Sequence, residues 1–144
     1  MKFLLSLLVL VFTNSVVFAQ AKGSDAKDFT FDKKTNEFSD ASGVVFKLEK
    51  IKSLTGPGMH NYYFTDKDGK RLVLFAFRPH VKVDDFHEIS FPETNIPSCE
   101  VSLAWKSITA YAKIFYERKI IVNGKLNESE AASFSKEVGK AFSR

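Results

Sequence analysis

Hydrophobic and polar residues alternate over short stretches of the chain from Phe29 onward. Val44, Phe46 and Leu48 are separated by polar neighbours, a spacing typical of a strand with one buried face. Residues 71–77 (RLVLFAF) are apolar almost throughout and predict a central strand covered on both faces. They follow residues 61–65 (NYYFT) across an Asp-Gly turn, so these two segments are predicted to form a hairpin.

Further short apolar runs extend the predicted sheet. Val81 and Val83 are expected to continue it, residues 89–91 form a short strand before Pro92, and alternation resumes from Cys99 to Leu103. Residues 56–58 (GPG) break the chain between two of the predicted strands.

The pattern changes in the last third of the chain. The even positions of residues 106–121 are mostly apolar, which is typical of a strand. The segment also fits a helix, whose apolar arc includes Trp105 and Phe115. Helix-favouring residues and the absence of Gly and Pro favour the helix, and the strand remains the alternative. A second helix is predicted to begin at Asn127, which is followed three residues later by Glu130 and by an apolar stripe ending at Phe142.

These elements predict an α+β fold: an antiparallel β-sheet of about five to seven strands followed by one or two C-terminal packing helices. The domain organisation depends on the N-terminus. Lys2, the apolar run at residues 3–12, and the small residues Val17 and Ala19 match a secretory signal. We expect residues 1–19 to be a cleaved signal peptide, 20–28 a flexible tail and 29–144 a single globular domain.

This N-terminus predicts an exported protein, periplasmic or secreted and of bacterial type, with no transmembrane segment after cleavage. A membrane anchor is the alternative, but the apolar run is short for a spanning helix. The formal charge is +4, yet basic and acidic residues are interspersed, so no nucleic-acid partner is expected. Cys99 is the only cysteine, cannot pair within the chain, and is expected to be a buried thiol.

Candidate metal ligands gather in one segment, residues 78–88 (RPHVKVDDFHE). His80, Asp84 and His87 have the side chains that bind zinc, with Asp85 and Glu88 as spares. However, His80 and His87 have opposite parity on a strand and would point to opposite faces. They could share an ion only if the chain turns between them, so the favoured interpretation is a polar connection and no metal or cofactor is expected.

Other candidates are weaker still. Cys99 would need a histidine base to act as a nucleophile, and no feature around it predicts a lowered thiol pKa. Tyr62, Tyr63 and Trp105 could line an aromatic groove for a ligand, although core-boundary aromatics are commoner. The leading hypothesis is a non-catalytic domain that binds an unknown protein or small-molecule partner. The alternatives are a metal-binding protein or metal-dependent enzyme, and a structural envelope-associated protein with an exposed edge strand.

Overall fold

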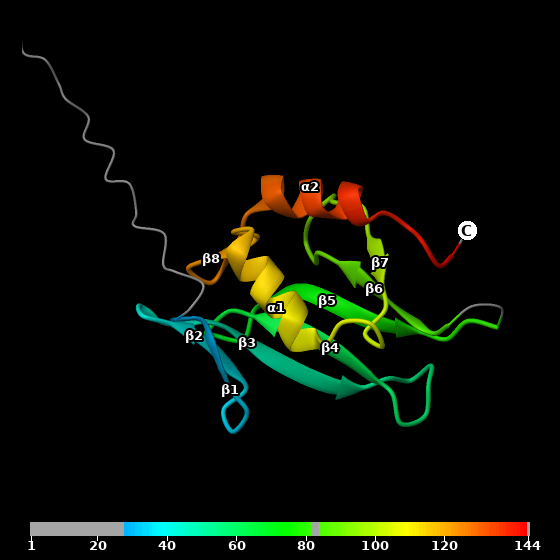
Figure 1. Ribbon diagram of the computed structural model, residues 1–144, viewed down its shortest axis with the longest axis horizontal. Helices are drawn as coiled ribbons and strands as arrows, with labels where there is room; N and C mark the ends of the chain where they lie inside the picture. The colour runs from blue at the N-terminus through cyan, green and yellow to red at the C-terminus, as the bar shows by residue number, and fades with distance from the viewer. Residues whose placement is uncertain (1–27, 82–83, 144) are drawn as a thin grey trace, which may run out of the picture.

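The computed structural model describes residues 28–81 and 84–143. Its main feature is a seven-stranded antiparallel sheet in which the spatial order of the strands is their order along the chain (Figure 1). The strands are β1 (Thr30–Asp32), β2 (Glu37–Asp40), β3 (Gly43–Lys52), β4 (His60–Thr65), β5 (Arg71–Arg78), β6 (Phe86–Ser90) and β7 (Cys99–Val101). Two helices follow, α1 (Ile108–Glu117) and α2 (Glu128–Val138), with a two-stranded ribbon of β8 (Ile121–Val122) and β9 (Lys125–Leu126) between them. The predicted α+β class is confirmed.

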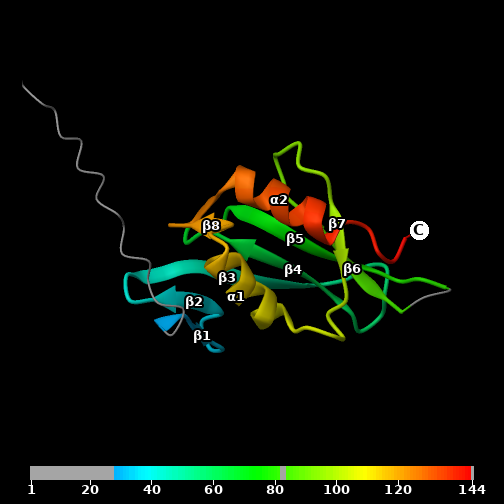
Figure 2. The same cartoon turned by 45° about the horizontal axis from the view of Figure 1, so that its top comes forward.

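Both helices lie over the same face of the sheet (Figures 1 and 2). The contact is aromatic: Phe115 of α1 meets Phe64 of β4 at 5.6 Å and Phe75 of β5 at 5.9 Å between ring centroids. Phe134 of α2 also contacts Phe115, with 5.1 Å between the ring centroids. One buried phenylalanine therefore joins the sheet to both helices.

A row of phenylalanine rings crosses the helix-covered face of the sheet. Phe38, Phe46, Phe64 and Phe75 come from four successive strands, and neighbouring ring centroids lie 4.9, 5.0 and 5.1 Å apart. All four side chains are buried. Burial of one such ring stabilises the fold by about 1.5–3 kcal/mol, which explains how this chain forms its core without a disulfide.

Two β-bulges increase the number of side chains that reach the core. In β3, Val45 is the extra residue between the Phe38–Phe46 and Ser39–Val44 pairs. In β5, Leu72 is the extra residue between the pairs that Arg71 and Val73 form with β4. Consecutive residues at these points are buried together, which a regular strand would not allow. The nearly continuous apolar sequence of β5 is thus accommodated partly by a bulge.

The predicted helix within residues 106–121 is confirmed, with a later start than its apolar arc suggested. The Ser107 hydroxyl caps α1 by accepting a hydrogen bond from the Ala110 amide at 3.2 Å, so Trp105 lies outside the helix. The predicted cap of α2 is also confirmed, since Asn127 accepts from the Glu130 amide at 3.5 Å. This helix ends at Gly139 with φ 64°, and Phe142 lies beyond it.

Two local expectations differ from the structure, and one element was not expected. Val81 does not continue the sheet and is fully exposed in the β5–β6 connection, while Val83 lies outside the described residues. The last strand before α1 ends at Val101 rather than reaching Leu103. The turn at Asn123 and Gly124 has positive φ at both positions, 50° and 70°, and therefore closes the β8–β9 hairpin, which the sequence analysis did not predict.

The proposed signal peptide and most of the tail, residues 20–28, fall outside the described residues, which begin at Asp28. Within the described part of the chain, neither helix has the length and apolar character needed to cross a bilayer.

Candidate interaction surface at one end of the sheet

Three connections leave the sheet at the same end. Lys52, the last residue of β3, pairs with His60, the first residue of β4. His87, near the start of β6, pairs with Phe77 near the end of β5 and with Val101, the last residue of β7. Figures 1 and 2 show the β3–β4 and β5–β6 connections projecting together at this end. We call this surface the loop end and define it by residues 53–59, 79–81, 84–85 and 102–107.

The most exposed large apolar side chains of the described residues lie at the loop end. Leu54 is 99% exposed, Val81 100% and Trp105 76%. We call these three side chains the apolar tips, and each comes from a different connection. The partly exposed Met59 lies in the same connection as Leu54. Three strongly exposed apolar side chains at the same end of a sheet are more informative than single ones scattered over the whole surface.

The β3–β4 connection, which includes Leu54, is held against the sheet by hydrogen bonds and a close contact. The Ser53 amide donates to the Met59 carbonyl at 2.9 Å, and the Thr55 hydroxyl donates to the Phe77 carbonyl at 3.3 Å. Gly56 lies directly against the Phe77 ring, where an added Cβ would be 2.3 Å from a ring carbon. Glycine is therefore the residue that lets this connection fold tightly onto β5.

His87 lies beneath the same connection and is nearly buried. Its Nε2–H donates to the His60 carbonyl at 3.2 Å, and its ring meets Phe77 edge-on at 5.5 Å and Tyr62 at 6.0 Å. Burial lowers the pKa of His87, and the hydrogen bond to the carbonyl opposes that shift only partly. This histidine is therefore a neutral structural link between β6 and β4 at neutral pH.

Trp105 contacts the C-terminal segment, which we define as residues 139–143. Its ring centroid lies 5.7 Å from that of Phe142, which stacks on Phe86 at 5.5 Å. The segment is held by Glu100, whose carboxylate accepts from the amides of Phe142 at 2.8 Å and Ser143 at 3.0 Å and from the Ser143 hydroxyl. Burial raises the pKa of Glu100, but these hydrogen bonds and Lys140 outweigh it, so the pKa is lowered.

The predicted metal ligands do not come together. His87 faces the core, whereas His80 lies beside Phe86 at 6.3 Å between ring centroids, and its amide donates to Asp85. Asp84 is exposed. Residues 28–81 and 84–143 contain no group of three or more His, Cys, Asp or Glu side chains that could hold a metal ion. The reason is their placement: His80 lies in the connection after β5, whereas His87 lies within β6 and is nearly buried.

The predicted aromatic residues are also separated. Tyr62 pairs with Phe75 on the helix-covered face. Tyr63, the next residue along the strand, lies on the other face beneath the Arg71 guanidinium at 4.1 Å, and this group forms two hydrogen bonds to Glu49. Trp105 is at the loop end. The three residues therefore share no groove.

Cys99 is buried, as predicted. Burial is the largest influence on its thiol and raises the pKa to about 11. A thiol with this pKa is protonated at neutral pH and is a poor nucleophile. Its surroundings thus give no support to the cysteine-nucleophile hypothesis.

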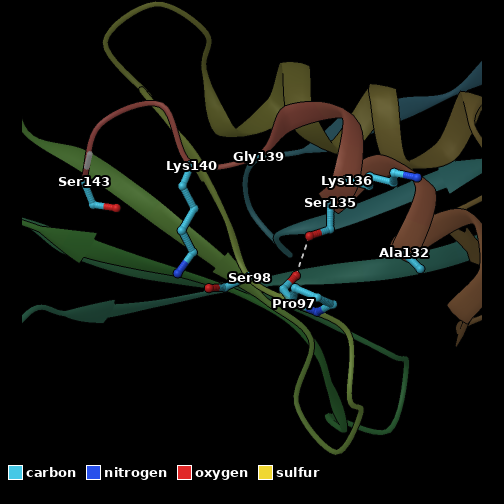
Figure 3. Close-up of a pocket in the computed structure, with 8 residues that line it drawn as sticks. All are labelled: Pro97, Ser98, Ala132, Ser135, Lys136, Gly139, Lys140 and Ser143. Atoms are coloured by element: carbon cyan, nitrogen blue, oxygen red, sulfur yellow. Dashed lines mark hydrogen bonds between the residues drawn. The ribbon is translucent and has the colours of Figure 1, made fainter.

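A hollow of about 630 Å³ lies beside α2 (Figure 3). It is lined by Pro97, Ser98, Ala132, Ser135, Lys136, Gly139, Lys140 and Ser143. Its hydroxyl groups already donate within the protein: Ser135 to the Pro97 carbonyl, Ser98 to Glu88 at 2.7 Å, and Ser143 to Glu100. Lys140 extends toward Ser98 (Figure 3) and lowers the pKa of both carboxylates. The hydroxyl groups of the hollow are thus already engaged within the protein, and that of Ser143 anchors the C-terminal segment.

Comparison with protein-family models, with curated proteins and with solved structures finds no match to this chain. The candidate site accordingly rests on geometry. Sequence reasoning singled out Trp105 but missed Leu54 and Val81. The signal that could have found Leu54 was its place beside the Gly-Pro-Gly segment, because a large apolar residue in a tight connection has little core to enter.

Proposed function

We propose that the protein is a small exported, non-catalytic interaction domain that binds its partner through the loop end. The observation that carries this proposal is the exposure of the apolar tips. Burial of a Leu, Val or Trp side chain in a partner is favourable by about 1.5–3 kcal/mol, so three such side chains at one end of the molecule provide a substantial driving force.

The architecture beneath the tips supports the same function. The connections arise from strands whose core side chains are buried, and Gly56 and Thr55 fix the first connection onto β5. A surface presented by a rigid sheet loses less conformational entropy on binding than a mobile one. The β3–β4 connection is therefore organised before any partner arrives.

Export is supported by the sequence, through Lys2, the apolar run at residues 3–12, and the small residues before Gln20. The test is to determine the N-terminus of the protein purified from cells that export it. A chain that begins at Gln20 is expected. A chain that retains residues 1–19 and remains in the cytoplasm would refute this part of the proposal.

Binding through the loop end is tested with a photo-crosslinking residue placed at position 105 in exporting cells. A matched chain carries it at position 122, because Val122 is also an exposed apolar residue but lies in the β8–β9 hairpin. We expect adducts from position 105 and none from position 122. Equal crosslinking at both positions, or none at either, would refute the loop end as the binding surface.

A further inference from the structure

We propose that the partner of the loop end is the surface of an anionic lipid bilayer. This inference rests on the proposed function, in which the loop end is the binding surface. Leu54, Val81 and Trp105 enter the boundary between headgroups and acyl chains, and exposed lysines contact the headgroups. Neither helix of the described residues crosses the bilayer, and the sheet stays in water.

The spacing of the apolar tips fits a bilayer better than a protein. The connections start on strands from β3 to β7, and strands lie about 4.8 Å apart, so the tips are spread over a width of about 19 Å. A protein partner would need a separate pocket for each of three isolated side chains and good shape complementarity between them. A bilayer interface receives each tip independently.

The chemistry of the tips also fits the interface. Tryptophan is enriched at membrane–water boundaries because its ring is apolar while its N–H remains hydrogen-bonded. Trp105 remains 76% exposed although Phe142 lies against one side of it, so most of its ring is open to solvent. Leu54 and Val81 are purely apolar and almost completely solvated.

Basic side chains on or beside the strands fall into two groups. Lys47, Arg71 and Arg78 are paired across strands, with Glu37 at 3.1 Å, Glu49 at 2.9 Å and Glu88 at 2.8 Å. By contrast, Lys50, Lys52 and Lys106 are exposed and form no ion pair with any residue in the described ranges; these three flank the tips from β3 and from the β7–α1 connection.

Acidic groups face the same region. Asp84 and Asp85 are exposed in the β5–β6 connection beside Val81, and Asp85 accepts a hydrogen bond from the His80 amide. Among the described residues, the exposed lysines that flank the tips therefore lie toward Leu54 and Trp105. We expect the protein to lie on an anionic surface with that side closest to the headgroups.

The experiment uses the exported protein with vesicles of mixed phosphatidylglycerol and phosphatidylcholine and with vesicles of phosphatidylcholine alone. Trp105 is the only tryptophan, so its fluorescence reports insertion directly. We expect sedimentation with the anionic vesicles, a blue shift of the emission, and much weaker binding to the neutral vesicles. In the double variant Leu54→Ser with Val81→Ser, affinity should fall about 100-fold, about tenfold for each tip.

The matched control is Val44→Ser with Val122→Ser, which removes apolar side chains that are 42% and 41% exposed elsewhere on the molecule. It should bind as the unaltered protein does. A third variant, Lys50→Glu with Lys52→Glu and Lys106→Glu, should remove the preference for anionic vesicles. All variants change exposed residues, and an unchanged melting temperature verifies that they are folded.

The outcomes separate this inference from the proposed function. Absence of binding to anionic vesicles overturns the inference, as does binding without a fluorescence shift and without sensitivity to the tip substitutions, which indicates adsorption of a basic protein only. If protein adducts still form from position 105, the loop end remains the binding surface and only the lipid partner is wrong. If position 105 also gives no adduct, both proposals fail.

Discussion

Replacement of Glu100 by glutamine should loosen the C-terminal segment from the sheet. The Glu100 carboxylate accepts two backbone amides, from Phe142 and Ser143, and one hydroxyl. Glutamine has nearly the same size but no charge, and only one of its two terminal atoms can accept. The substitution therefore tests the hydrogen bonds of the carboxylate with little change in packing.

The magnitude follows from the contacts. A hydrogen bond to a charged group contributes about 1.5–3 kcal/mol and a neutral one about 0.5–1.5 kcal/mol, so a bond that loses its charge loses about 1 kcal/mol. The two amide bonds, at 2.8 and 3.0 Å, can still form to the amide oxygen of glutamine. Because both become neutral, the free energy of unfolding of Glu100→Gln should fall by about 2 kcal/mol.

The assay is urea unfolding at neutral pH, combined with hydrogen exchange at the amides of Phe142 and Ser143. Glu93→Gln is the control, because Glu93 pairs with Lys70 in an exposed ion pair of the kind that contributes little. The pKa of Glu100 is lowered from 4.5, so its contribution is present above that pH and is lost as the pH falls further. The difference between the unaltered protein and the variant should therefore shrink in acid. Equal stability of the two variants at neutral pH, with unchanged exchange, would show that Glu100 does not hold the segment.

Three further results are expected. Phe115→Ala should lower the free energy of unfolding by about 3–5 kcal/mol in urea titration, because the ring joins the sheet to both helices; a loss below about 1 kcal/mol would contradict this role. The protein should lose stability as the pH falls below 6.5, since the unfolded chain protonates His87 before the folded one does, and His87→Phe should lack this part of the loss in the same titration. Cys99 should resist a thiol reagent in the folded protein and react once urea unfolds it, whereas rapid labelling of the native state would contradict its burial and its pKa of about 11.

Much of the fold follows from local sequence patterns. The hairpin of β4 and β5 and the cap of α2 depend on residues close in sequence, and alternation identifies which side chains enter the core. These features were predictable because neighbouring residues alone determine them. Parity was not what separated His80 from His87, because His80 lies in a connection and only His87 lies on a strand.

Other features depend on contacts that no local pattern contains. The bulges at Val45 and Leu72 are defined only by the register in which each strand pairs with its neighbour. Trp105 fits the apolar arc of α1, yet Ser107 caps the helix after it and leaves the indole outside. The loop end is assembled from connections far apart in the chain, so its apolar tips could be recognised as a set only after folding.

The strand order of the sheet has a consequence for how the chain folds. Each of the seven strands pairs only with its neighbours in sequence, so every hairpin closes a short loop and loses little entropy in doing so. The contacts of Phe115 with Phe64 and Phe75, by contrast, join distant parts of the chain. The meander can therefore form progressively from adjacent hairpins, and the docking of α1 onto the aromatic row is the long-range step expected to limit the folding rate.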